Sequence, residues 1–179
     1  PLLFILFTAP LCGAVEAVSP GCEALMYADD LTLRTSNCRP ELAAETMQAG
    51  LDELVRWGEA NFLPLAPEKT EALVVSSDPK EQKGKCRPRL TLGGVDVEYN
   101  PNPRVLGVVL DATLQFTAQA AAAARKIRSR GKVLTALAAR NWGSSTRTLR
   151  HVFSAFVRPA GLYAAEVWEP FLAPTHRGK

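Results

Sequence analysis

The spacing of apolar and polar residues changes several times along the chain, and each change marks a new predicted element. Residues 1–15 (PLLFILFTAPLCGAV) are almost uniformly apolar and predict a buried helix. Two short apolar runs, at residues 22–28 and 31–33, flank the pair Asp29 and Asp30. Such runs around turn-forming residues predict a tight β-hairpin, with the two aspartates at its tip.

Helical spacing follows from residue 40 to residue 62 and predicts an amphipathic helix, with Ser36 or Asn37 as a cap. One stripe of this helix collects Ala43, Met47, Leu51, Leu54, Val55, Gly58 and Phe62. The charged residues lie mostly off it, namely Glu41, Glu45, Asp52, Glu53, Arg56 and Glu59. Two prolines end the helix, and residues 71–76 predict a buried strand.

Turn residues then separate further strands from a helical ending. Residues 89–99 predict a hairpin, because Gly93 and Gly94 supply the positive φ that its turn needs. Residues 105–111 predict one more strand. The last third is helical, with an alanine-rich helix from about 117 to 139, a turn at residues 141–143, a helix opened by Ser144 or Ser145 that runs towards Arg158, and a third short helix within residues 161–168.

This order of elements predicts an α+β fold. Strands dominate the first two-thirds and helices the rest, which places a subdomain boundary near residues 112 to 117. The composition is that of an ordinary globular protein, with 47% apolar and 22% charged residues. A net charge of +3 indicates no partner unless the basic residues cluster.

The cysteines and the apolar opening bear on location. Four irregularly spaced cysteines without nearby histidines favour reduced thiols over disulfides or zinc. The opening run has no basic leader, and Pro10 and Glu16 interrupt it, so we expect neither a signal peptide nor a membrane-spanning helix. We therefore expect an intracellular protein, and a fragment whose first helix starts before residue 1.

Asp29 and Asp30 are the sharpest chemical feature of the sequence. Adjacent carboxylates repel each other unless a cation compensates, and their oxygens suit Mg²⁺. Two such ions can clamp the attacking and leaving oxygens of a phosphoryl transfer. A solvated turn is the alternative that the dipeptide leaves open.

The residues around this pair extend the argument. Residues 27–30 read YADD between apolar strands, which resembles the Y-x-D-D signature of reverse transcriptases. Four other segments resemble blocks of the same family, most of all of its non-LTR (LINE-type) retrotransposon branch, and they occur in the family's order: PLLF at residues 1–4, NFLPLAPEKTE at 61–71, VLGVVLD at 105–111 and LYAAEVW at 162–168. In the second block a displaced Pro67 replaces the asparagine that usually precedes the lysine.

The resemblance implies roles for matched residues. It implies a partial polymerase palm at residues 1–112 and a thumb-like helical subdomain at 113–179. Asp29 would bind a catalytic Mg²⁺ (or Mn²⁺), with Asp30 as a weaker ligand, and Lys69 would stabilise the leaving pyrophosphate. Tyr27, Leu106 and Gly107 would face the primer end or the incoming nucleotide. Strand packing for Tyr27, a surface position for Lys69 and a bulge at Gly107 remain open.

A basic cluster gives independent support. Five basic residues occupy an eight-residue stretch inside the alanine-rich helix: Arg125, Lys126, Arg128, Arg130 and Lys132. A helical face of this kind suits nucleic-acid phosphates, although such a helix can also be merely solvated. The implied partners are an RNA template, a DNA primer and dNTPs, together with the upstream part of the same polyprotein. That upstream part would carry the fingers and a third carboxylate, so we expect the fragment to be inactive alone.

Three other classes of protein share some of these features. A non-catalytic nucleic-acid-binding module from a degenerate element would keep the basic helix without the chemistry. A group II intron maturase also uses YADD, but the block at 105–111 and Trp168 favour the retrotransposon branch. A viral RNA-dependent RNA polymerase usually has glycine where this chain has Ala28.

Overall fold

The computed structural model describes residues 2–76, 87–138 and 143–172. They form two compact units, Pro1–Asn100 and Pro101–Lys179. The division falls before the boundary near residues 112 to 117 that the order of strands and helices predicted, so that the whole VLGVVLD segment belongs to the second unit. The mixture of helices and short strand pairs agrees with the expected α+β class, whereas the palm and thumb assignment stays a prediction.

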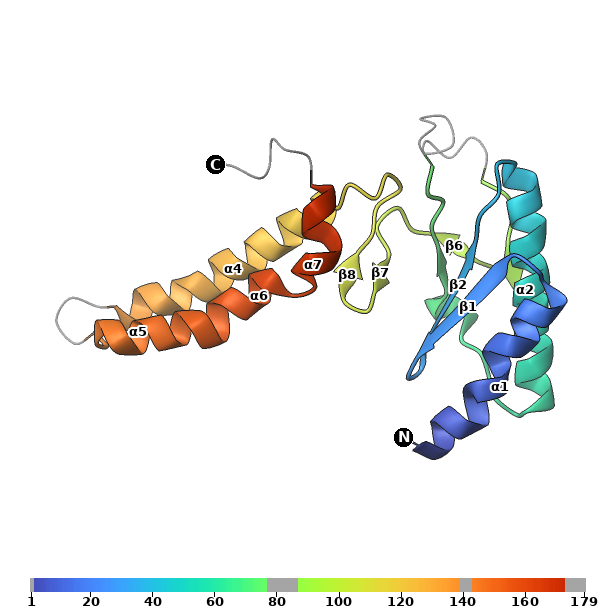
Figure 1. Cartoon of the computed structure of the whole chain (residues 1–179), viewed down its shortest axis with the longest axis horizontal. Coiled ribbons are helices and arrows are strands. Elements are labelled where there is room, and N and C mark those ends of the chain that lie inside the picture. The colour runs from blue at the N-terminus through green and yellow to red at the C-terminus, as the bar shows by residue number, and fades with distance from the viewer. Residues whose placement is uncertain (1, 77–86, 139–142, 173–179) are drawn as a thin grey trace. The chain divides into compact units, whose positions relative to one another are not determined.

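The first unit combines two helices, a long hairpin and several short strands (Figure 1). In chain order its elements are α1 (Leu2–Val18), β1 (Cys22–Tyr27), β2 (Asp30–Thr35), α2 (Pro40–Ala60), the 3-10 turn η1 (Pro67–Lys69), β3 (Glu71–Ala72), β4 (Thr91–Leu92), β5 (Val95–Asp96) and β6 (Glu98–Tyr99). The pairs β1–β2 and β4–β5 are antiparallel, while β3 pairs with β6 in parallel.

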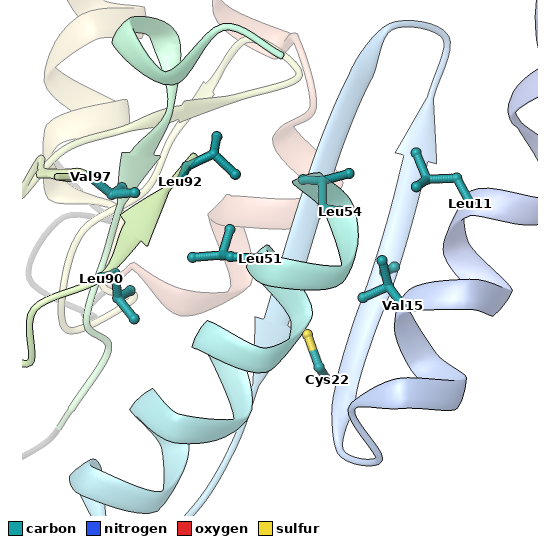
Figure 2. Packing of buried hydrophobic residues seen from close by; sticks show 9 residues of the cluster. Leu11, Val15, Cys22, Leu51, Leu54, Leu90, Leu92 and Val97 are labelled. Carbon is teal, nitrogen blue, oxygen red and sulfur yellow. The ribbon is translucent and has the colours of Figure 1, made fainter. Parts of the chain in front are cut away.

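Helix α2 organises the core of this unit (Figure 2). Leu51 points towards the segment that carries Leu90, Leu92 and Val97, and α1 packs on another side of α2. Gly50 permits a close approach to β1, since a Cβ atom there would lie 2.9 Å from Cys22 Sγ. The Gln48 amide also exchanges two hydrogen bonds with the backbone of Thr91, at 2.9 and 3.0 Å, and so ties β4 to the helix.

Two expectations about the helices of this unit are wrong. Helix α1 is not buried as a whole: its buried residues are Thr8, Leu11 and Val15, and Leu3 is 83% exposed. Within the described residues, helices and strands contact α1 along one stripe, formed against α2 and β1. Because α1 is apolar on every side, its other faces leave apolar side chains exposed. Phe62 is 94% exposed because α2 ends at Ala60 and a φ of +54° turns the chain away from the helical stripe.

Other details of the prediction change as well. Glu53, placed off the stripe, is buried and forms an ion pair with Arg56. Neither Ser36 nor Asn37 caps α2, whose N-cap is Arg39, followed by Pro40 in the first turn. The strand expected at residues 71–76 is paired only at Glu71–Ala72. The hairpin turn at Gly93 and Gly94 is confirmed, with φ values of +59° and +81°.

The second unit contains a short hairpin and a set of packed helices. Its elements are β7 (Arg104–Val105), β8 (Val108–Val109), α4 (Thr117–Leu137), α5 (Thr146–Val152), the π-helical η2 (Phe153–Val157), α6 (Arg158–Leu162), α7 (Ala165–Trp168) and the 3-10 turn η3 (Glu169–Phe171). The alanine-rich helix is confirmed, and Ser145 caps α5 by accepting a hydrogen bond from the Thr148 amide at 3.2 Å. Most of the turn expected at residues 141–143 lies outside the described residues.

The strand expected at residues 105–111 is wrong. The chain reverses at Leu106 and Gly107, which have φ values of +47° and +81°, and β7 and β8 pair antiparallel around them. The run VLGVVL is apolar enough for one strand, but the glycine permits the left-handed turn inside it.

Helices α4 and α6 approach each other closely. A Cβ atom added to Gly161 would lie 2.3 Å from Ile127 Cδ1, so a larger residue does not fit there without rearrangement. Val108, Phe116, Ala123 and Trp168 form the main apolar cluster nearby.

Among the helices that the structure describes, none combines the length and the apolar character needed to cross a membrane. Cys12, Cys22 and Cys38 form no disulfide, and Cys86 lies outside the described residues.

Candidate metal and nucleic-acid sites

The two aspartates lie where the β1–β2 hairpin turns. Tyr27 pairs with Asp30, so the turn consists of Ala28 and Asp29, and Asp30 is already the first residue of β2. The tip is thus one residue earlier than predicted. Ala28 has a φ of +55°, at a turn position where glycine is the preferred residue. Six paired residues in each strand hold the YADD segment at the end of a regular ladder.

Both carboxylates are open to solvent and ligands. Asp29 and Asp30 are exposed, and Tyr27 is 69% exposed. Within the described ranges, neither carboxylate has a hydrogen-bond or ion-pair partner, so their oxygens remain available for a hard cation. The same residues contain no cluster of three or more His, Cys, Asp or Glu side chains that could hold a metal ion. The pair therefore offers two carboxylates, but the described residues around it do not complete the ligand set of a metal site.

Lys69 lies in another part of the first unit. It ends η1, is exposed, and donates its backbone N–H to the carbonyl of Ala66 at 3.0 Å. In the described part of the chain no ion pair joins Lys69 to Asp29 or Asp30. Its assignment to the pyrophosphate stays a prediction.

Leu106 and Gly107 form the turn between β7 and β8, where they meet Tyr163. The Tyr163 hydroxyl donates to the Leu106 carbonyl at 2.8 Å. A Cβ atom on Gly107 would lie 3.2 Å from Tyr163 Cε1. Two segments picked out by the sequence, 105–111 and 162–168, are thus in direct contact within the second unit.

Asp111 closes the first of these segments and shapes the loop into α4. Its Oδ1 accepts hydrogen bonds from the Thr113 hydroxyl at 2.7 Å and from the amides of Thr113 and Gln115, each at 3.1 Å. Burial alone raises the pKa of Asp111, but these donors and the Phe116 amide outweigh it and lower the pKa overall. The folded loop therefore stabilises the charged form of the Asp111 carboxylate.

The basic residues of α4 do not all face the same way. Arg125, Arg128 and Lys132 are exposed and follow i, i+3, i+7 spacing, which puts them on one stripe of the helix. Lys126 is exposed to one side of this stripe. Arg130 instead donates to the Phe156 carbonyl at 2.7 Å and lies over the Phe156 ring at 4.8 Å, so it ties α4 to η2.

More positive charge lies on α5. An open hollow of about 370 Å³ is lined by Thr146, Arg147, Arg150, His151 and Ser154. Residues 101–179 contain twelve Lys and Arg against three Asp and Glu, whereas residues 1–100 contain nine against fifteen. The second unit therefore has a formal charge of +9 and the first a charge of −6, an asymmetry that the net +3 conceals.

Sequence reasoning missed Tyr163, Asp111 and Gln119 as residues that shape this region. Gln119 is buried and accepts a hydrogen bond from the Val109 amide at 3.0 Å. Asp111 and Tyr163 lie within the segments 105–111 and 162–168, yet no rule of spacing predicts that one segment forms a hydrogen bond with the other. Gln119 gave no signal at all within an alanine-rich helix.

Comparison with known proteins gives three relatives from transposable elements. The chain is 30% identical over 172 residues, 94% of its length, to the probable RNA-directed DNA polymerase from transposon BS of Drosophila melanogaster. It is 29% identical over 185 residues to the RNA-directed DNA polymerase from mobile element jockey of Drosophila funebris, a match that covers all of this chain. It is 27% identical over 158 residues, 86% of its length, to the putative 115 kDa protein in type-1 retrotransposable element R1DM of Drosophila melanogaster.

These matches cover much less of the relatives. The chain spans 18%, 19% and 15% of the transposon BS, jockey and R1DM proteins, respectively. No protein-family model matches the chain, and no solved structure gives a significant match.

Proposed function

Because this chain belongs to the family of RNA-directed DNA polymerases of non-LTR retrotransposons, we propose that it supplies part of the active site and part of the nucleic-acid-binding surface of such an enzyme. The observation that carries this proposal is the YADD hairpin, which presents two exposed carboxylates at the end of a regular strand pair. The similarity over 94% of the chain to a polymerase supplies the context.

The reaction is nucleotidyl transfer from a dNTP to a DNA primer on an RNA template. Asp29 would hold Mg²⁺ (or Mn²⁺) and Asp30 would support it, both through carboxylate oxygens. When bound, divalent cations supply charge stabilisation for the attacking and leaving oxygens. Lys69 would add positive charge near the leaving pyrophosphate, and Tyr27 and the Leu106–Gly107 turn would contact the primer end or the nucleotide.

We propose further that residues 1–179 are inactive by themselves. The described residues offer no three-carboxylate cluster, and the chain spans less than a fifth of each relative, so the remaining ligand and the fingers would come from the upstream part of the polyprotein. Primer extension by the purified chain on poly(rA)/oligo(dT), with Mg²⁺ and dTTP, is expected to give no product. Robust incorporation would refute this point.

The metal role has a test that needs no activity. Mn²⁺ added to isotope-labelled chain should broaden the NMR signals of the Tyr27 to Asp30 amides, and Asp29→Ala should remove most of this broadening. Glu45→Ala is the matched control, because it removes one exposed carboxylate from α2 and leaves residues 27–30 unchanged. Equal broadening in wild type and Asp29→Ala would contradict a metal site at the hairpin.

The second candidate is a non-catalytic nucleic-acid-binding module, favoured by the charge of +9 in the second unit. Asp29→Ala in the complete polymerase separates the two. Loss of primer extension with unchanged template binding supports catalysis, because binding through α4 does not need the carboxylate. Unchanged extension supports the binding module.

A further inference from the structure

The turn between β7 and β8 is poorly supported by its own strands. Two residue pairs, Arg104 with Val109 and Val105 with Val108, form the ladder, and the Leu110 amide donates to the Pro103 carbonyl at 3.0 Å just beyond it. Leu106 has a φ of +47°, in a region that residues with a side chain adopt rarely. A two-stranded hairpin of this length is not stable alone, so contacts from elsewhere must define the shape of this turn.

Tyr163 makes those contacts at the tip of the turn. Its hydroxyl donates to the carbonyl of Leu106 at 2.8 Å, across 57 positions of sequence. Its ring also lies beside Gly107, where an added Cβ atom would be 3.2 Å from Cε1 and 3.6 Å from Cζ. Because Gly107 has no side chain, the Tyr163 ring packs directly against the backbone of the turn.

Tyr163 is itself held by the core of the second unit. Its carbonyl accepts a hydrogen bond from Trp168 Nε1 at 3.0 Å, and Trp168 is 8% exposed among Val108, Phe116 and Ala123. The next residue, Ala164, has a φ of +52°, which turns the chain towards α7. Two hydrogen bonds in series thus connect the buried Trp168 indole to Tyr163 and Tyr163 to the turn.

The Tyr163 side chain adds little to the apolar core, because the residue is 54% exposed. The Gln119 side chain already holds β8, because it accepts a hydrogen bond from the Val109 amide. The distinctive contribution of Tyr163 is therefore the conformation of the turn.

We infer that Tyr163 is a positioning residue, whose hydroxyl and ring hold the Leu106–Gly107 turn in the shape that receives the primer end. This inference rests on the proposed function, which places the primer at that turn. It adds a residue that acts through the turn and need not touch the nucleic acid.

Tyr163→Phe tests the inference, because it removes the hydroxyl and keeps the ring. The matched control is Tyr99→Phe, since the Tyr99 hydroxyl donates in the same way to the Pro88 carbonyl, at 2.7 Å, in the first unit. Amide hydrogen exchange at residues 106 to 109 of the 179-residue chain reports the turn. Fluorescence anisotropy compares its affinity for an RNA–DNA duplex with a recessed DNA 3′ end and for a blunt duplex of equal length.

In Tyr163→Phe, exchange at the turn should rise by about 2- to 12-fold, the loss expected for one neutral hydrogen bond. The preference for the recessed end should fall by a similar factor, while affinity for the blunt duplex stays the same. Tyr99→Phe should change neither quantity. Faster exchange with an unchanged preference would overturn the positioning role and leave only a structural contact.

Two further results separate this inference from the proposed function. A wild-type chain that binds both duplexes equally overturns the role of the turn, even if Mn²⁺ still broadens the hairpin signals. Loss of the Mn²⁺ effect, with the preference intact and sensitive to Tyr163→Phe, overturns the metal proposal and supports Tyr163.

Discussion

At the scale of single residues, left-handed backbone marks the positions where sequence rules succeed or fail. The turn at Gly93 and Gly94 was predictable because two glycines in a row permit positive φ at both positions. Ala28 and Leu106 also have positive φ, but their side chains give no such signal. The sequence therefore predicts the tip of the YADD hairpin one residue too late, and it predicts a continuous strand where the chain reverses at Leu106.

Gly107→Ala should destabilise the second unit. The substitution forces a side chain into a φ of +81° and puts its Cβ 3.2 Å from Tyr163 Cε1. The left-handed conformation alone costs about 1–2 kcal/mol. Urea unfolding followed by circular dichroism measures the change. Gly131→Ala is the control within α4. Nothing lies within 4 Å of its Cβ, so this substitution should raise the free energy of unfolding by about 0.5–1 kcal/mol. Equal effects of the two would contradict the turn geometry.

Asp111→Asn should reveal a pH-dependent contribution to stability. The folded pKa of Asp111 lies below its ordinary value of 3.8, because hydrogen bonds outweigh burial. A lowered folded pKa gives stability that is present above the ordinary value and is lost as pH falls through the folded pKa. The urea midpoint of the wild type should therefore exceed that of Asp111→Asn at pH 7, and the gap should narrow towards pH 3. A constant gap would argue against the charged carboxylate as the cause.

At the scale of elements, periodicity predicted the long helices well and the short strands poorly. Helices α2 and α4 each extend over 21 residues, enough for a helical pattern to be clear. Strand β3 has two residues, and its partner β6 lies 27 positions away in sequence, so nothing local specifies that pairing. Helix α1 shows the opposite limit, because a segment that is apolar on all sides does not reveal which side is covered.

Gly50→Ala should weaken the packing of α2 on β1. Its new Cβ would lie 2.9 Å from Cys22 Sγ and 3.5 Å from Val15 Cγ1, and overpacking of this kind costs about 1–3 kcal/mol. Gly13→Ala in α1 is the control, because nothing lies within 4 Å of that position. Combining Gly50→Ala with Cys22→Ala should cost less than the sum of the two changes, since the shorter side chain relieves the clash. Additive urea results would exclude this contact as the cause.

At the scale of the whole molecule, the distribution of charge says more than its total. Net charge of +3 suggested little, yet the two units carry −6 and +9. The basic cluster on α4 was predictable from sequence because its members lie close together along the chain. That Arg130 binds Phe156, and so stands apart from the exposed stripe, depends on the packing of α4 against η2, which no local pattern encodes.

Replacing Arg125, Arg128 and Lys132 by glutamine should weaken duplex binding and its salt dependence. Each phosphate contact adds about 0.9 to the slope of log affinity against log salt, so three lost contacts should reduce the slope by roughly 2–3. Anisotropy titrations at several salt concentrations measure it. As a control, replacing Arg34, Arg39 and Arg89 by glutamine removes the same total charge from the first unit. This triple variant should leave the slope of log affinity against log salt nearly unchanged. Equal slopes for both triple variants would show that only total charge matters.

The close approach of α4 and α6 has a consequence for the evolution of related sequences. Since a Cβ atom at Gly161 would lie 2.3 Å from Ile127 Cδ1, the two positions share one volume. A relative that carries alanine or serine at the first position should carry a smaller residue than isoleucine at the second. Positions 127 and 161 should therefore co-vary across the family, although neither bears a charge nor lies in the YADD hairpin.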